Sequence, residues 1–199
     1  MDNKHVLAAI FSMGIKGETA DARGLAKRLG LRVGEAAKEI DDQKKAGRVR
    51  FEGRSARLTP RGRRSIRVVF IGGGFELIHY GHVYTISKAK SLGDVLVVSV
   101  ARDSTIRKRK KREPLINEGD RVRLLSSLRD VDAAILGVQG DIYDTLQKVD
   151  PDIVALGYDQ YHMEDEVRRE AAKRGMQLEV VRLDSPYPHI KTTRILREL

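Results

Sequence analysis

The stretch that decides the fold reads IGGGFELIHYGH and covers residues 71–82. Three glycines follow a short apolar run, and two histidines, His79 and His82, come three positions apart just after them. Glycines let a ligand approach the backbone closely and adopt angles that are closed to other residues. A helix that begins near Gly81 would offer unpaired N–H groups and a positive dipole end to an anion. The stretch therefore predicts a phosphate site, to which the two imidazoles add ring N–H donors.

Three other interpretations of this stretch stay open: a dinucleotide-binding turn, a zinc site, and two ordinary surface histidines. A dinucleotide-binding turn expects its helix glycines at other spacings. A zinc site lacks a visible third ligand, because the chain has no cysteine and its remaining histidines are His5, His162 and His189.

From Ile66 onward, short apolar runs alternate with segments of helical periodicity. The runs are continuous, which is typical of parallel strands covered on both faces: IRVVFIG, VLVVSVA, AAILGV, DIVALGYD and LEVVRLD. The segments between and after them predict helices: HVYTISKAKSLG, DRVRLLSSLRD, DIYDTLQKV, EVRREAAKRG and TTRILREL. Ligands of such α/β folds bind at the carboxyl ends of the strands, near the point where strand order reverses. We therefore expect the chemistry in the loops at 72–82, 102–121 and 157–162.

Composition sets outer limits on the class of protein. The 199 residues are 41% hydrophobic, enough for a packed core, and the formal net charge is +10. Without cysteine there are no disulfides and no thiolate metal sites. No apolar run approaches the roughly 20 residues that span a bilayer, and the N-terminus lacks the apolar core of a signal peptide. We expect a soluble cytoplasmic protein with no membrane partner.

The charge is unevenly distributed along the chain. Residues 1–64 hold 16 Lys/Arg against 8 Asp/Glu, whereas residues 65–199 hold 22 against 20. Such asymmetry suggests two domains with different partners. We place the boundary within PRGRRS, residues 60–65, and predict domains at 1–64 and 65–199.

The basic N-terminal third predicts three helices and a hairpin. HVLAAIF has helical spacing, and in DARGLAKRLG Asp21 can cap a second helix that Gly30 ends. RVGEAAKEIDDQKKAG predicts a third helix that Gly47 terminates, and RVRFEGRSARLT alternates around Glu52-Gly53 as a hairpin would. We expect the third helix to turn four side chains inward: Val33, Ala36, Ala37 and Ile40.

Three helices followed by a basic hairpin resemble a winged helix-turn-helix domain. That resemblance implies DNA as a partner, with the third helix in the major groove and the hairpin arginines on phosphates. Winged helices also serve as dimerisation or docking modules, and the acidic side chains of the third helix would oppose DNA if they faced it: Glu35, Glu39, Asp41 and Asp42.

GGGFELIHYGH resembles the T-G-x-F-D-x-x-H-x-G-H signature of the cytidylyltransferase-like nucleotidyltransferase superfamily, with Phe75, His79, Gly81 and His82 in register. The segments ARDSTIRKRKKREP, GDR and GYDQ are most similar to the archaeal FAD synthases, while glycerol-3-phosphate cytidylyltransferases share the core. The resemblance implies an α/β fold with a Rossmann-like parallel sheet, and a homodimer.

Members of the family attack the α-phosphorus of a nucleoside triphosphate with a phosphate oxygen of the acceptor and expel pyrophosphate. The resemblance thus implies transfer of AMP from ATP to FMN, which gives FAD, with Mg²⁺ accompanying the triphosphate. The first alternative is a cytidylyltransferase that uses CTP and glycerol 3-phosphate or another phosphate ester. The second is a DNA-binding regulator in which this domain senses a nucleotide or flavin without turnover.

The resemblance also implies roles for single residues. His79 and His82 hold phosphates through the transition state, and Arg121 faces phosphate. Lys108 and Lys110 close over the phosphates from the loop RKRKKR, residues 107–112, although such a run is also typical of a solvated loop or a nucleic-acid patch. The same nucleotide is expected to contact Gly73, Gly74, Phe75, Tyr80, Gly81, Asp159, Thr192 and Thr193.

Two of these assignments carry a structural interpretation as well. Asp159, in GYDQ, follows a strand and reaches the ribose or base region by similarity, but Asp also commonly caps a helix. Thr192 and Thr193 can cap the last helix and hold phosphate at its N-terminus. No paired carboxylates mark a protein-built metal cage, so the metal is expected to travel with the nucleotide.

The chain departs from the signature at four positions: Glu76 replaces an aspartate, Tyr80 a proline, Pro186 an arginine, and Lys191 the first serine of the family's last motif. Lys191 could supply the charge that Pro186 lacks, from a different direction. These departures leave nucleotidyl transfer as the expected reaction and the acceptor open.

Overall fold

The computed structural model describes residues 3–160, 163–190 and 192–195. The chain divides into two compact units, Met1–Arg67 and Val68–Leu199, so the division falls three residues beyond the predicted boundary at 64/65. No helix in the described ranges is both long enough and apolar enough to cross a membrane.

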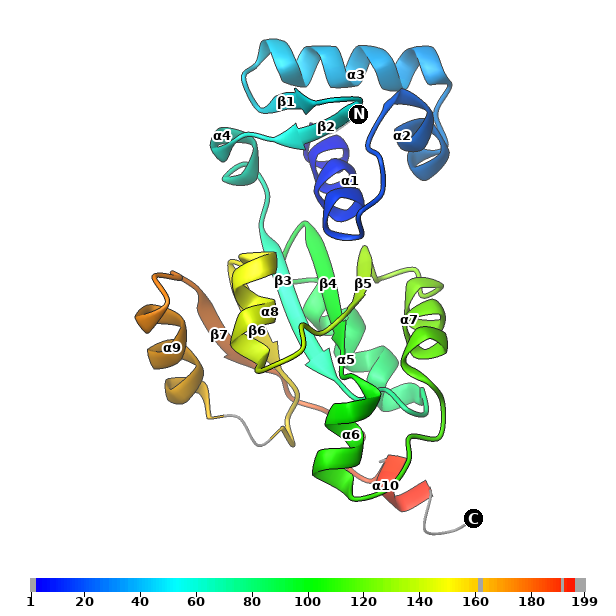
Figure 1. Cartoon of the computed structure of the whole chain (residues 1–199), viewed down its shortest axis with the longest axis vertical. Coiled ribbons are helices and arrows are strands. Elements are labelled where there is room, and N and C mark those ends of the chain that lie inside the picture. Colours follow the sequence, from blue (N-terminus) through cyan, green and yellow to red (C-terminus); the bar gives the residue numbers. More distant parts are fainter. Residues whose placement is uncertain (1–2, 161–162, 191, 196–199) are drawn as a thin grey trace. The chain divides into compact units, whose positions relative to one another are not determined.

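The first unit has the predicted order of three helices and a hairpin (Figure 1). Its elements are α1 (Asn3–Ile15), α2 (Ala22–Leu29), α3 (Val33–Lys45), β1 (Val49–Glu52), β2 (Ser55–Leu58) and α4 (Pro60–Arg63). As predicted, the Asp21 side chain caps α2 by accepting from the Gly24 N–H, and Gly30 ends it in a left-handed conformation. The strands pair antiparallel with Glu52 opposite Ser55, so the turn is Gly53-Arg54, one residue later than expected.

Only two of the four α3 side chains that were predicted to face inward are buried. Ala36 and Ile40 are buried, but Val33 is 50% exposed and Ala37 is exposed, so their placement in the core was wrong. The buried face continues instead through Gln43, which donates to Asn3 Oδ1 at 2.9 Å and accepts from Arg48 at 3.0 Å. Val33 is the first residue of the helix.

The second unit alternates strand and helix, as the sequence predicts. Its strands are β3 (Val68–Gly73), β4 (Val95–Val100), β5 (Ala133–Leu136), β6 (Ile153–Leu156) and β7 (Glu179–Arg182). Its helices are α5 (Tyr80–Lys90), α6 (Asp103–Lys110), α7 (Glu118–Ser126), α8 (Ile142–Val149), α9 (Glu164–Lys173) and α10 (Thr192–Ile195). The expected loop at 102–121 is not a simple loop, because it contains α6 and the first four residues of α7.

The five strands form one parallel sheet in the order β5-β4-β3-β6-β7. The order reverses between β3 and β6, and right-handed crossovers then place α5 and α7 on one face and α8 and α9 on the other. In Figure 1, α8 lies in front of the sheet and α5 behind it. The reversal brings the ends of β3, β4 and β6, which precede the three expected loops, to one edge.

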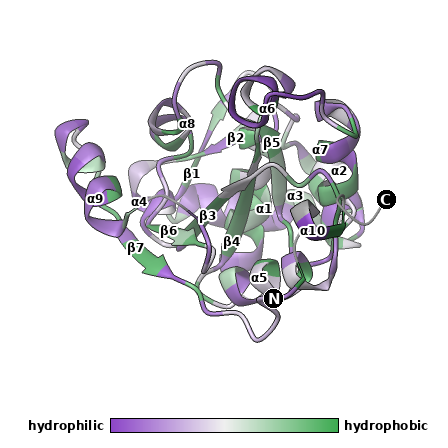
Figure 2. Ribbon diagram, turned by 90° about the horizontal axis from the view of Figure 1, so that it is seen from below, coloured by the Kyte–Doolittle hydropathy of each residue, from purple (hydrophilic) through white to green (hydrophobic). Residues whose placement is uncertain are grey.

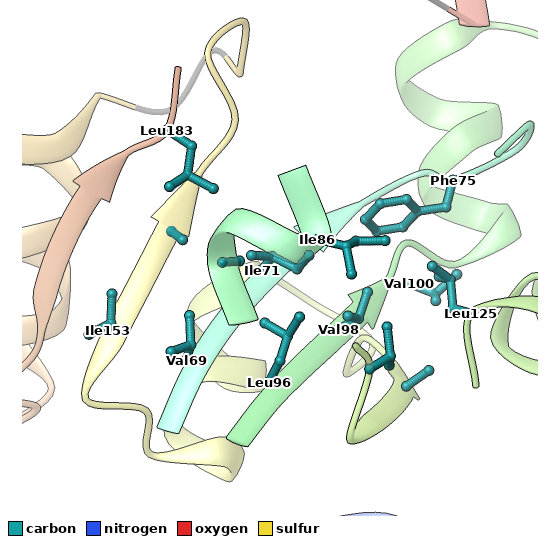
Figure 3. Packing of buried hydrophobic residues seen from close by; sticks show 14 residues of the cluster. Val69, Ile71, Phe75, Ile86, Leu96, Val98, Val100, Leu125, Ile153 and Leu183 are labelled. Carbon is teal, nitrogen blue, oxygen red and sulfur yellow. The ribbon is translucent and has the colours of Figure 1, made fainter. Parts of the chain in front are cut away.

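A hydrophobic cluster fills the space between the sheet and the helices α5 and α7 (Figure 3). It takes alternate strand residues, such as Val69 and Ile71 from β3 and Leu96 and Val98 from β4, as the two-residue period of a strand requires. Figure 2 shows the central strands as hydrophobic, whereas α6 and α9 are mostly hydrophilic. The cluster therefore anchors one face of the sheet, and the other face carries Phe70, Ser99 and Val154.

Candidate active site

The glycine-rich turn begins where β3 ends. Gly73 is the last residue of the strand, and its carbonyl accepts from the Ala101 N–H at 2.8 Å. None of the three glycines has a positive φ, so the expectation of unusual angles there was wrong. Phe75 takes the left-handed conformation instead, with φ of 49°, and its ring is held in the core. A Cβ on Gly73 would lie 2.9 Å from that ring, which explains the glycine.

The two histidines lie together at the start of α5. His79 is the N-cap residue of the helix, and its ring stacks on that of His82 with 3.9 Å between centroids. The Phe75 ring contacts the His82 ring from another side, with 5.4 Å between the ring centroids. Gly81 leaves room for the His79 ring, because a Cβ at this position would lie only 3.2 Å from His79 Nδ1. Both Nδ1 atoms are buried and make no hydrogen bond within the described residues, as expected for ring nitrogens that await a ligand.

Burial keeps both imidazoles neutral. It lowers the pKa of His82 from 6.5 to about 4, and the neighbouring His79 lowers it further while Asp159 opposes the shift. Burial also lowers the pKa of His79, against the effect of Asp159. At neutral pH each ring therefore presents one N–H donor without a permanent charge.

This pKa predicts a titration that nuclear magnetic resonance can follow. A protonated imidazole is charged, and burial disfavours that form, so the ring resonances of His82 should stay constant from pH 8 down to 5.5. In the unfolded chain the group titrates near 6.5, so the stability that His82 contributes is fully present above pH 6.5. It is lost as the pH falls from 6.5 towards 4, because the unfolded state then binds the proton first. A midpoint near 6.5 in the folded protein would contradict the prediction.

A cavity of about 240 Å³ opens beside the histidines, lined by the glycine turn, Asp159, Tyr187 and Thr192 among others. Asp159 is exposed, and α9 has Met163 as its N-cap, so the helix-cap interpretation of Asp159 was wrong. Thr192 is the first residue of α10 and donates to the Leu77 carbonyl at 3.4 Å, which ties the C-terminal segment to the loop before α5. Lys191 and the side chain of Thr193 lie outside the described residues.

Tyr80 and Pro186, two of the departures from the signature, flank Tyr187. The Tyr80 side chain is 58% exposed and meets the Tyr187 ring edge-on at 4.8 Å between centroids. Pro186 is exposed and presents no charge. Where the signature has an arginine this segment therefore carries no charge, and Tyr187 of the aromatic pair lines the histidine cavity.

Glu76, a third departure, anchors the basic segment to the turn. Its side chain is fully buried; Lys110 pairs with Oε2, and Arg112 donates to Oε1 at 2.7 Å and to Oε2 at 3.1 Å. Burial alone would raise the pKa of Glu76, but Arg112 and Lys110 outweigh it and lower the pKa to about 2. Lys110 therefore lies at Gly74, as expected for a phosphate ligand, but already neutralised by a carboxylate. Lys108, two residues earlier on α6, is exposed and makes no ion pair within the described residues.

The partners that the structure shows for Arg121 are all protein groups. It is fully buried, and its guanidinium donates to the Gly74 carbonyl at 2.5 Å, to Asp103 at 2.6 Å and to the Ile116 carbonyl at 2.9 Å. All three nitrogens are occupied, so the side chain joins the glycine turn, the start of α6 and the segment before α7. The geometry makes it a positioning residue for the turn.

Gln160, which sequence reasoning did not assign, connects the two strand ends at the switch point. Its amide nitrogen donates to the Gly72 carbonyl at 2.6 Å, and its oxygen accepts from the Gly157 N–H at 3.1 Å. Arg182 fixes the same loop by donating to the carbonyls of Gly157 and Gln160. The similarity of GYDQ to the archaeal FAD synthases could have indicated Gln160 as well, but a role was predicted only for Asp159.

A larger cavity, of about 620 Å³, adjoins the turn on the side of α6 and α8. It shares five lining residues with the histidine cavity: Gly72, Gly73, Gly74, Ala155 and Gln160. Lys108 and Lys110 also border it. Within the described part of the chain, no group of three or more His, Asp or Glu side chains could hold a metal ion.

Comparison with known proteins agrees with this geometry. The family model described as cytidylyltransferase-like matches residues 70–198. An FAD synthase of Thermococcus onnurineus is 43% identical over 145 residues, which are 71% of this chain and 96% of that protein. An FAD synthase of Aciduliprofundum boonei is 48% identical over 115 residues, 58% of this chain and 76% of that protein.

Solved structures show the same fold. A crystal structure titled as a lipopolysaccharide core biosynthesis protein, from Thermoplasma volcanium, superposes with a TM-score of 0.58 at 42% identity, over 60% of this chain and 98% of that one. A protein of Archaeoglobus fulgidus superposes with a TM-score of 0.50 at 20% identity, over 62% of this chain and 93% of that one.

A doubly wound parallel sheet with a paired-histidine turn at its switch point defines a Rossmann-like nucleotidyltransferase. The chain belongs to the cytidylyltransferase-like family, in which FAD synthases of several archaea are 38–48% identical to it.

Proposed function

We propose that this protein transfers AMP from ATP to FMN and so makes FAD and pyrophosphate. The observation that carries the proposal is the stacked pair His79 and His82 at the glycine turn, in a chain 43% identical to an FAD synthase along nearly the whole of that protein. A neutral, half-buried donor pair suits a triphosphate, because it binds phosphate oxygens without a large permanent charge.

In this proposal the nucleotide occupies the histidine cavity. His79 and His82 donate to oxygens of the α- and β-phosphates, and their bonds strengthen as charge develops in the transition state. Asp159 and Tyr187 border the ribose and base. Lys108 supplies the permanent positive charge, and Lys110 adds to it when a phosphate draws it from Glu76.

The reaction needs no covalent enzyme intermediate. A phosphate oxygen of FMN attacks the α-phosphorus in line, and the new P–O bond forms as the bond from the α-phosphorus to the pyrophosphate oxygen breaks. The leaving electron pair stays on pyrophosphate. Mg²⁺ arrives with ATP as part of the substrate and is held mainly by phosphate oxygens. The carboxylates nearby fit that view, since Glu76 is already paired with two cations.

The proposal is tested by pyrophosphate release from a grid of ATP or CTP with FMN or glycerol 3-phosphate, each with Mg²⁺. Release with ATP and FMN alone is the expected result, with FAD identified by mass. Release only with CTP and the glycerol ester would contradict it and assign an alcohol-phosphate acceptor. Flavin binding without any release would favour the sensing role instead.

We further propose that residues 1–64 form a winged helix that binds duplex DNA. The strong positive charge supports this, and two of the four acidic side chains on α3 are already paired, Glu35 with Arg32 and Asp41 with Lys45. A mobility shift of random duplex by the full chain should weaken steeply between about 50 and 200 mM salt, because phosphate contacts release counterions. No shift at low salt would favour a docking role.

The homodimer implied by the resemblance stays a prediction. Its test is the molar mass in solution, by light scattering over a tenfold range of concentration. A constant monomer mass would contradict it.

A further inference from the structure

We propose that the larger cavity binds the isoalloxazine ring of the flavin, an assignment that rests on the proposed function. The cavity lies on the sheet face opposite the hydrophobic cluster. Its floor is made of alternate strand residues, Phe70 from β3 with Val154 and Leu156 from β6, all at most 3% exposed. None of these three residues belongs to the hydrophobic cluster, which takes the residues between them.

Size and chemistry distinguish this cavity from the one beside the histidines. At about 620 Å³ it has more than twice the volume of the histidine cavity, which is about 240 Å³. Ile142 and Ile106 add apolar walls from α8 and α6. A flat, mainly apolar ring system fills such a space, whereas glycerol phosphate would leave its walls uncovered.

One polar atom in the lining points to a ligand with a polar edge. Tyr143 is only 8% exposed, and its hydroxyl is buried with no hydrogen-bond partner in the described part of the chain. A buried hydroxyl without a partner is costly, unless a bound molecule completes it. The isoalloxazine ring joins an apolar benzenoid end to a pyrimidinedione end with two carbonyls, so it matches both the walls and the hydroxyl.

The position of the cavity relative to the turn suits the reaction. Gly72, Gly73 and Gly74 border both cavities, and Lys108 lies at the edge of the larger one. A ring in the larger cavity therefore directs its ribityl phosphate to the glycine turn. The nucleotide reaches the same turn from the histidine side, which brings acceptor oxygen and α-phosphorus together.

The test compares three variants of the full chain in the FAD-forming reaction. Ile142→Trp fills the cavity and should raise KM for FMN at least about tenfold while KM for ATP changes less than about twofold, since Ile142 lines only the larger cavity. Gln147→Trp makes the same change at an exposed position of α8 outside the lining and should leave both constants unaltered.

Tyr143→Phe provides the second measurement, because it removes only the hydroxyl. It should weaken FMN binding, followed by flavin fluorescence, by about three- to tenfold, the worth of one hydrogen bond. The melting temperature should not fall, since the hydroxyl has no hydrogen-bond partner among the residues that the structure describes. A KM for FMN unchanged in both Ile142→Trp and Tyr143→Phe would overturn the assignment, even if the enzyme makes FAD. A wild-type chain that neither binds FMN nor makes FAD would instead refute the proposed function, and the ring site with it.

Discussion

Replacing His82 with alanine should abolish nearly all turnover while the protein stays folded. The change removes one phosphate donor and also the ring on which His79 stacks, at 3.9 Å between centroids. Loss of a single preorganised transition-state donor costs about 10²–10³ in kcat. Because the second donor is displaced as well, we expect the larger loss, with a smaller change in KM for ATP.

The measurement is kcat for FAD formation in His82→Ala beside the melting temperature. His5→Ala is the matched control, since His5 is exposed on α1 in the other compact unit. DNA binding, where it occurs, should be the same in both variants. Full activity of His82→Ala would show that the site has been assigned to the wrong residues.

The second large effect is expected at Arg121. Arg121→Met removes three hydrogen bonds and leaves Asp103 without its partner, so the free energy of unfolding should fall by about 3–5 kcal/mol, as when one member of a buried ion pair is lost. Arg121→Lys keeps the charge, but one ammonium cannot reach the Gly74 carbonyl, Asp103 and the Ile116 carbonyl together. It should stay folded and lose about 10²-fold in kcat, because a small misplacement of the turn is enough.

The two roles of Arg121 separate in the kinetics. A positioning residue lowers kcat and alters KM for ATP at temperatures well below melting, whereas a merely stabilising residue lowers only the melting temperature. Arg123→Lys is the control on the same helix, since that side chain is 84% exposed and pairs with Asp120 at the surface. Arg121→Lys with unchanged kcat would contradict the positioning role.

Local patterns were enough to predict most of the fold. Continuous apolar runs and helical spacing identified the parallel sheet, and the spacing of glycines and histidines placed the candidate site at the end of β3. The helix α6 was not predicted. It has a single buried residue, Ile106, so its sequence shows no helical periodicity of apolar residues, and a run of like charges is typical of a loop. Lys and Arg nonetheless form helices well when their side chains reach solvent.

Long-range contacts could not be read from the sequence. Arg121 bonds to a carbonyl 47 residues away, and a basic residue in a phosphate-binding family suggests phosphate unless that contact is known. The positive φ fell on Phe75 rather than a glycine because tertiary packing holds its ring in the core. Likewise, the sequence does not predict the ion pair between Glu76 and Lys110, because the two residues are far apart along the chain.

The shared glycine turn has a kinetic consequence. Gly72, Gly73 and Gly74 separate two cavities whose other walls come largely from different elements. With the two substrates bound as proposed, neither has to leave before the other binds, and neither covers the other's cavity. Initial-rate plots against the two substrates should therefore intersect, as in a random sequential mechanism, and the parallel lines of a ping-pong reaction should not appear.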